Sequence, residues 1–229
     1  GRDGFFIGLP GDQLRDGAFA FDGGEWLLGD GDTTLSFAAW PNVMLTLEAN
    51  GDGLVLAPPA NATWTLSPLV TGTGGIVKRG AGTVVLAQGE ACTGTNHCES
   101  GVLAFAGTAV TGCAVAGAGT FADAEMRRVV LSLSVGDGLV VDEIPTFADC
   151  TLGRVTVDLG RTAENPLPLV LPQPIVVAHY TGSTAPRAGD FRLTGTGHGD
   201  TMGTFEVSGG EIRLTGYAPG KPGLCIIFR

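Results

Sequence analysis

Apolar and polar residues alternate in short segments along most of the chain. The alternation is clearest in residues 44–48 and 63–66, where every second side chain is apolar. A period of two is typical of strands, because successive side chains of a strand point to opposite faces of a sheet. Turn-forming residues separate these segments, as in 29–32 and 50–53. The pattern predicts many short strands, each with one buried and one wet face.

The predicted strands extend over the whole chain and leave little room for helices. Before residue 165 they are 25–28, 34–37, 43–47, 54–56, 63–66, 83–86, 100–105, 109–110, 113–115, 129–135, 139–141 and 155–159. One segment, 123–128, has a helix-forming composition. An isolated helix of that length is not stable without tertiary support. After residue 165, prolines interrupt an apolar run, and 203–207, 211–215 and 224–228 predict a small β-meander.

The composition agrees with an all-β chain. Glycine accounts for 38 of the 229 residues, without the three-residue period of collagen, and only 16% of residues are charged. A chain so poor in lysine and glutamate is poorly suited to long surface helices. The sequence therefore predicts short strands joined by tight turns.

The charge argues against nucleic acid as a partner. The chain carries 13 Lys and Arg against 23 Asp and Glu, a net charge of -10, and it has no basic run longer than the pairs Lys78-Arg79 and Arg127-Arg128. Binding to a phosphate backbone needs a clustered basic face. No apolar stretch approaches the roughly 20 residues that cross a bilayer, so we expect no membrane insertion by this segment. No signal peptide is recognised, so an export signal is expected upstream of residue 1.

Residues 72–105 carry a strand-turn-strand rhythm of about twenty residues, a period typical of stacked-coil folds. The residues from Gly74 to Leu86 follow the pattern Gly-Gly-Leu-x-Lys-x-Gly-x-Gly-Thr-Leu-x-Leu, with Ile76 and Val84 at two of its leucine positions. This segment resembles the autotransporter-associated β-strand repeat of bacterial surface and secreted proteins. The resemblance implies a right-handed parallel β-helix and an extracellular or cell-surface address. In that family the repeats form stalks and carry no catalytic residues.

These observations together predict the fold. We expect an all-β right-handed parallel β-helix, or β-solenoid, over residues 1–164, with a β-meander over 165–229 packed on it as a cap. A cap is expected because an exposed last coil leaves an unpaired strand edge. A β-sandwich is the alternative fold.

Five cysteines leave at least one thiol without a disulfide partner. Cys92 and Cys98 enclose a short polar loop and are the candidate disulfide, which an exported protein permits. Cys113 and Cys150 either bridge two coils or, like Cys225, are free thiols that pack as small hydrophobic side chains.

Candidate metal and catalytic residues are few. Asp22, Asp30 and Asp32 are weak candidates for Ca²⁺ ligands, because turns favour Asp-Gly for backbone reasons alone. We therefore expect no metal and no cofactor. Asp142 and Glu143 would form a carboxylate pair of the glycosidase kind, but adjacent strand residues point to opposite faces. His198 next to Asp200 is more typical of a surface loop than of an acid–base unit.

The three tryptophans are the candidate ligand-binding residues. Sugars stack on exposed aromatic rings, and Trp26, Trp40 and Trp64 would form a platform if they lined up across successive coils. Core positions are the alternative for all three.

The function that the sequence favours is structural. We expect a stalk or passenger segment of a secreted or surface-displayed bacterial protein, with an adhesive role toward a host or bacterial surface glycan or protein, and not an enzyme. A carbohydrate-binding module is the first alternative, and a polysaccharide-degrading β-helix enzyme is the second.

Overall fold

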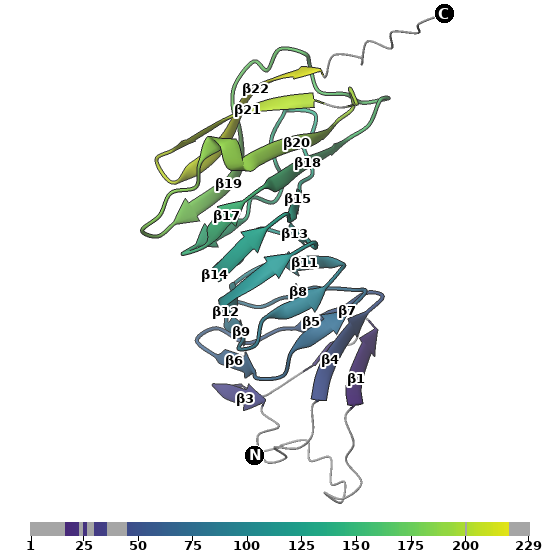
Figure 1. The fold of residues 1–229 in the computed structure, drawn as a ribbon, viewed down its shortest axis with the longest axis vertical. Coiled ribbons are helices and arrows are strands. Elements are labelled where there is room, and N and C mark those ends of the chain that lie inside the picture. Colours follow the sequence, from purple (N-terminus) through teal and green to yellow (C-terminus); the bar gives the residue numbers. More distant parts are fainter. Residues whose placement is uncertain (1–16, 23–24, 27–29, 36–44, 200, 220–229) are drawn as a thin grey trace, which may run out of the picture.

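The computed structural model describes residues 17–22, 25–26, 30–35, 45–199 and 201–219. Within these residues the chain is all-β apart from one 3₁₀ turn, η1 (Ala188–Asp190), which confirms the predicted class. The described strands belong to a four-stranded sheet and a mixed sheet of 18 strands. Figure 1 shows them stacked along the long axis, from β1 and β3 at one end to β21 and β22 at the other. No helix among the described residues has the length and apolar character needed to cross a membrane.

All parallel pairings among the described strands, except that of β14 with β17 (Thr151–Gly153), fall into three series, in which each strand pairs with one from a later stretch of chain. The first series contains β1 (Gly17–Asp22), β4 (Leu45–Asn50), β7 (Val70–Gly72) and β10 (Glu90–Cys92). The second contains β2 (Glu25–Trp26), β5 (Leu54–Leu56), β8 (Ile76–Lys78), β11 (Thr95–Cys98), β13 (Ala114–Ala116), β15 (Val130–Ser132), β18 (Val155–Arg161) and β20 (Phe191–Thr196). The third contains β3 (Thr33–Leu35), β6 (Thr63–Leu66), β9 (Thr83–Leu86), β12 (Val102–Thr111), β14 (Thr120–Arg127), β16 (Thr146–Ala148) and β19 (Ile175–Thr181).

Register places the large apolar side chains directly above one another. In the third series Trp64, Val84, Leu103, Phe121 and Phe147 pair in turn, and all five are buried. The rings of Phe121 and Phe147 lie 6.1 Å apart between centroids. Because a one-residue slip would turn these side chains outward, burial of this column fixes the register of the strands.

The last strands change direction. β21 (Thr201–Ser208) pairs antiparallel with β20 and with β22 (Glu211–Pro219), and β22 pairs antiparallel with β19. These strands make the larger sheet mixed, and they include the predicted segments 203–207 and 211–215. The predicted strand 224–228 lies outside the described residues.

The one segment with helix-forming composition is a strand. Residues 124–127 form the second half of β14 and pair with β12 on one side and with β17 (Thr151–Gly153) on the other. Asp123 and Arg128, with φ of 50° and 56°, bend the chain on both sides of this part. β12 pairs with residues 124–127 and β17 with residues 125–127, so tertiary pairing overrides the local propensity.

Candidate functional site

A buried lysine ends β8. We call the bend that follows it, residues 79–82 between β8 and β9, the corner. In β8 the first and third side chains point inward, and this alternation buries Lys78 completely. Its Nζ donates hydrogen bonds to the carbonyl oxygens of Arg79 (2.7 Å), Gly80 (2.8 Å) and Ser100 (2.9 Å). An ammonium has three donors, so each of them has an acceptor here. Desolvation by burial lowers the pKa of Lys78, and the nearby Cys98 thiol opposes that shift.

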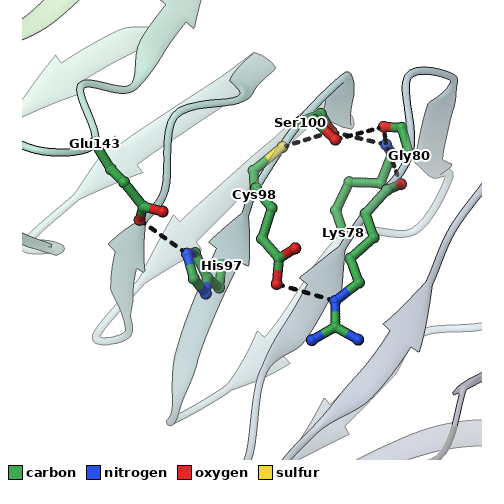
Figure 2. Close-up of polar contacts among 8 residues, drawn as sticks. Lys78, Gly80, His97, Cys98, Ser100 and Glu143 are labelled. Carbon is green, nitrogen blue, oxygen red and sulfur yellow. Dashed lines mark hydrogen bonds and ion pairs between the residues drawn. The ribbon is translucent and has the colours of Figure 1, made fainter.

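Cys98 of the neighbouring strand β11 pairs with Lys78 and likewise contacts backbone carbonyls. Cys98 in β11 is in register with Lys78, and its Sγ lies 3.7 Å from the carbonyl oxygen of Ser100, 3.8 Å from that of Gly101 and 3.7 Å from that of Thr120. Burial raises the pKa of Cys98 to about 11. A thiol that stays protonated is a poor nucleophile, so Cys98 is a structural donor. Figure 2 shows both residues at this corner.

An ion pair and a histidine–carboxylate contact lie on the surface beside this corner (Figure 2). His97 Nε2 is 3.2 Å from Glu143 Oε2, and Arg79 Nε donates to Glu99 Oε1 at 3.0 Å. All four side chains are about one-third to one-half exposed, with relative accessibilities of 34–51%. Solvent weakens such pairs, and each contributes about 0–1 kcal/mol to stability.

Glu143 reaches His97 from the connection between β15 and β16, residues 133–145. The predicted strand 139–141 is not formed there: Val135 and Val141 make one isolated antiparallel bridge. The largely buried Arg161 donates to the carbonyl oxygen of Gly136 and holds the base of this connection. The connection is therefore fixed at its base by Arg161 and at its far end by the contact between Glu143 and His97.

A second polar cluster is enclosed within the core. Glu90 Oε2 accepts from the backbone N–H of Cys92 at 2.6 Å, and Glu90 Oε1 accepts from Asn96 Nδ2 at 3.1 Å and from the Cys113 thiol at 3.6 Å. Asn96 Oδ1 in turn accepts from the backbone N–H of Ile76 at 3.0 Å. A buried carboxylate is tolerated where it is fully hydrogen-bonded, as it is here.

The candidate disulfide between Cys92 and Cys98 is not formed in the structure. Both cysteines, like Cys113 and Cys150, are free and buried. Cys92 ends β10 in the first series of strands, where its neighbours are Glu90 and Cys113. Cys98 ends β11 in the second series and points to backbone carbonyls instead. Proximity in sequence therefore does not bring the two sulfurs together.

The structure changes the predicted tryptophan platform. Trp64 is 1% exposed and belongs to the apolar column of the third series, so it presents no ring to solvent. Its indole N–H has no hydrogen-bond partner. The backbone of Trp26 lies in β2, next to β5, and its side chain is not described. Trp40 lies outside the described residues.

The acidic residues proposed as weak Ca²⁺ candidates act at turns where the structure describes them. Asp30 and Asp32 are exposed, and Asp32 Oδ1 accepts from the backbone N–H of Thr63 at 2.8 Å. Asp22 ends β1, opposite Asn50, and its side chain is not described. Across the described part of the chain, no three or more His, Cys, Asp and Glu side chains come together as a metal site.

His198 is a structural contact residue. Its Nε2 is 2.7 Å from the carbonyl oxygen of Leu167, and its ring stacks on Tyr217 with 6.0 Å between centroids. The Tyr217 hydroxyl donates to the carbonyl oxygens of Leu167 (3.0 Å) and Pro168 (2.9 Å). These contacts fasten the proline-rich segment to β22. Asp200, the other half of the pair considered from the sequence, lies outside the described residues.

Sequence reasoning assigned no role to the two buried charged residues, Lys78 and Glu90. Alternation gives a signal for Lys78, because it is two residues from Ile76 and shares its face. The same alternation places Glu90 on one face with Cys92, but its partner Cys113 comes from a later part of the chain.

No family model, curated protein or solved structure matches this chain.

Proposed function

We propose that this chain is a β-solenoid with a C-terminal β-meander cap, and that it serves as a stalk or passenger segment of a secreted or surface-displayed bacterial protein. The observation that carries the proposal is the repeated corner contact. Lys78 Nζ donates to the carbonyl of Ser100, and Cys98 Sγ lies against the carbonyl of Thr120, both 22 residues further along the chain. Regular spacing of such contacts is the property of a stacked repeat.

The chemistry of the buried polar groups also favours a scaffold. Lys78 and Glu90 are hydrogen-bonded within the chain. Burial raises the pKa of the Cys98 and Cys150 thiols to about 11, which keeps both protonated near neutral pH. A general base or nucleophile needs a pKa near the working pH and access to a substrate. These groups hold the chain together instead of acting on a ligand.

A stalk holds a binding part away from a surface, so the adhesive contact with a surface glycan or protein is made by the part that the stalk carries. Burial of Trp64 removes one of three rings from the alternative carbohydrate platform. A sugar site on this chain would then depend on Trp26 and Trp40.

A binding and turnover assay separates the three functional classes. The purified chain is incubated with a panel of host and bacterial polysaccharides, and retention and released reducing or unsaturated ends are measured together. We expect no retention and no product. Retention lost in Trp40→Ala but kept in the core variant Trp64→Phe would establish a carbohydrate-binding module. Released product would establish an enzyme.

Small-angle scattering tests the solenoid itself. Stacked parallel strands advance about 4.8 Å per coil, so the particle should be a rod with a constant cross-section. A compact, nearly isotropic particle would contradict the solenoid and favour the sandwich alternative.

A further inference from the structure

Two cysteines from successive stretches of the chain meet at one buried carboxylate. The Cys113 thiol donates to Glu90 Oε1 at 3.6 Å, and the backbone N–H of Cys92 donates to Glu90 Oε2 at 2.6 Å. Glu90 and Cys92 share the buried face of β10, and burial, Glu90 and Cys113 all raise the pKa of the Cys92 thiol. Both cysteines are 2% exposed. Asn96 Nδ2 lies 3.6 Å from Cys113 Sγ and closes the cluster on its other side. The Glu90 carboxylate thus contacts both cysteines inside the chain.

We propose that Cys92 and Cys113 are a site of disulfide formation that joins two successive turns of the chain. The cysteines lie on neighbouring levels, because Thr95 pairs with Ala114 and the backbone N–H of Ala114 donates to the carbonyl oxygen of Gly94 at 3.2 Å. Cys113 is therefore level with Gly94, two residues from Cys92. Neighbouring strands are about 4.8 Å apart, and the Cα atoms of a disulfide are separated by about 4.4–6.8 Å. The distance between two levels falls in this range, and the contacts that both cysteines make with Glu90 bring them together across the two-residue offset.

Glu90 stays satisfied after the bond forms. Oxidation removes the Cys113 thiol donor from its carboxylate, but the backbone N–H of Cys92 still donates to Oε2 and Asn96 Nδ2 still donates to Oε1. A buried carboxylate that lost all its donors would be strongly destabilising. The two remaining donors make the oxidised state compatible with the same fold.

The other described thiols are directed elsewhere. Cys98 Sγ lies against three backbone carbonyls, and Cys150 Sγ lies 3.3 Å from the carbonyl oxygen of Phe121 and 3.4 Å from that of Ala148. Neither cysteine contacts Glu90 in the structure. The geometry thus selects one pair from the four described thiols.

The reaction is thiol–disulfide exchange with a small disulfide such as oxidised glutathione. One cysteine thiolate attacks a sulfur of the oxidant, forms a mixed disulfide and releases one reduced thiol. The second cysteine thiolate then attacks the protein sulfur of the mixed disulfide and releases the second reduced thiol. Two protein thiols lose two electrons and two protons, and one oxidant disulfide gains them. Because both cysteines are buried in the fold, the exchange takes place while the chain folds.

In the cell this step requires the oxidising compartment that the proposed function implies. The experiment supplies the oxidant in vitro, so it tests the Cys92–Cys113 disulfide alone. Its result does not depend on whether the chain is exported.

The test is refolding of the full reduced chain from urea in a glutathione redox buffer, followed by alkylation of the remaining thiols. Trypsin leaves Cys92, Cys98 and Cys113 in one peptide, so a protease that cuts after glutamate is needed. Cleavage after Glu90, Glu99 and Glu125 gives the peptides 91–99 and 100–125. We expect these two peptides to be linked without reductant and separate with it. The link should persist in Cys98→Ser and disappear in Cys92→Ser and in Cys113→Ser.

A stability measurement completes the test. The oxidised chain should unfold at a higher urea concentration than the same chain after reduction, because the bond restricts the unfolded state. The double variant Cys92→Ser/Cys113→Ser should show no such difference between the two conditions. Absence of the 91–99 to 100–125 link, a bond between Cys92 and Cys98, a link that includes Cys150, or a lower urea midpoint on oxidation would overturn the proposal.

Discussion

Lys78 and Cys98 occupy the same corner position in two neighbouring strands. They are in register, and each contacts the carbonyl oxygen of the residue 22 positions ahead, Ser100 for Lys78 at 2.9 Å and Thr120 for Cys98 at 3.7 Å. Both also contact carbonyls of their own corner. A charged ammonium and a neutral thiol thus close successive corners by the same contact. The stronger donor is at Lys78, where three carbonyls lie within 3 Å of Nζ.

Removal of the Lys78 ammonium should destabilise the chain. Lys78→Met keeps most of the side-chain volume but removes the charged donor from three part-buried carbonyls, of which Gly80 keeps the Ser100 hydroxyl and Ser100 keeps the Cys98 thiol. We expect a loss of roughly 2 kcal/mol. Urea unfolding measures the change. The matched control is Arg79→Met, which removes an exposed ion pair with Glu99 and should cost under about 1 kcal/mol. Equal losses in the two variants would show that the corner contacts contribute little.

Gly101 should tolerate no side chain. Its φ is +69°, and an added Cβ would lie 2.3 Å from the carbonyl oxygen of Gly82 and 2.7 Å from Lys78 Nζ. Gly112 has a similar φ of +74° with open space around it. Gly112→Ala should therefore cost about 1 kcal/mol from the backbone alone, and Gly101→Ala should cost clearly more. Chemical denaturation of both variants separates the cost of backbone strain from that of steric contact. Similar losses of unfolding free energy in the two variants would mean that the corner shifts to accept the added Cβ.

The stability of the chain should fall in alkaline solution. Burial raises the pKa of Cys150 from its ordinary 9.0 to about 11. Above pH 9 the unfolded chain loses this proton while the folded chain keeps it, so the contribution of Cys150 is complete below pH 9 and is lost as the pH rises through about 11. The free energy of unfolding, measured from pH 8 to 11, should decline less steeply in Cys150→Ala. Parallel pH curves for the two proteins would contradict this assignment.

Loss of the contact between His97 and Glu143 should loosen the 133–145 connection without unfolding the chain. Glu143→Gln removes the negative charge from an exposed pair, so the global free energy of unfolding should change by less than about 1 kcal/mol. Hydrogen exchange of residues 139–145 should become faster. Asp142→Asn, a neighbouring exposed carboxylate, is the control and should leave exchange unchanged. If both variants change exchange equally, general charge and not the His97 contact holds the connection.

Local pattern determined the class of this protein and several of its elements. Alternation and turn residues gave 54–56, 63–66 and 83–86 with the same bounds as β5, β6 and β9, because side-chain period and turn chemistry are properties of a few adjacent residues. The alternation also explains why Lys78 is buried, because it lies two residues after Ile76 on the same face of a strand. Strand 139–141 was wrongly predicted, because the apolar run there has no neighbouring strand to pair with beyond one bridge.

Only the tertiary structure decided which distant residues meet. The pairing of β12 and β17 with residues 124–127 made a strand of a segment with helical composition. The stacking of levels put Cys92 with Cys113 instead of Cys98 and enclosed Trp64 in the core. It also brought Glu143 to His97 across 46 residues. The physical reason is that register between strands depends on burial summed over the whole stack, which no local stretch of sequence contains.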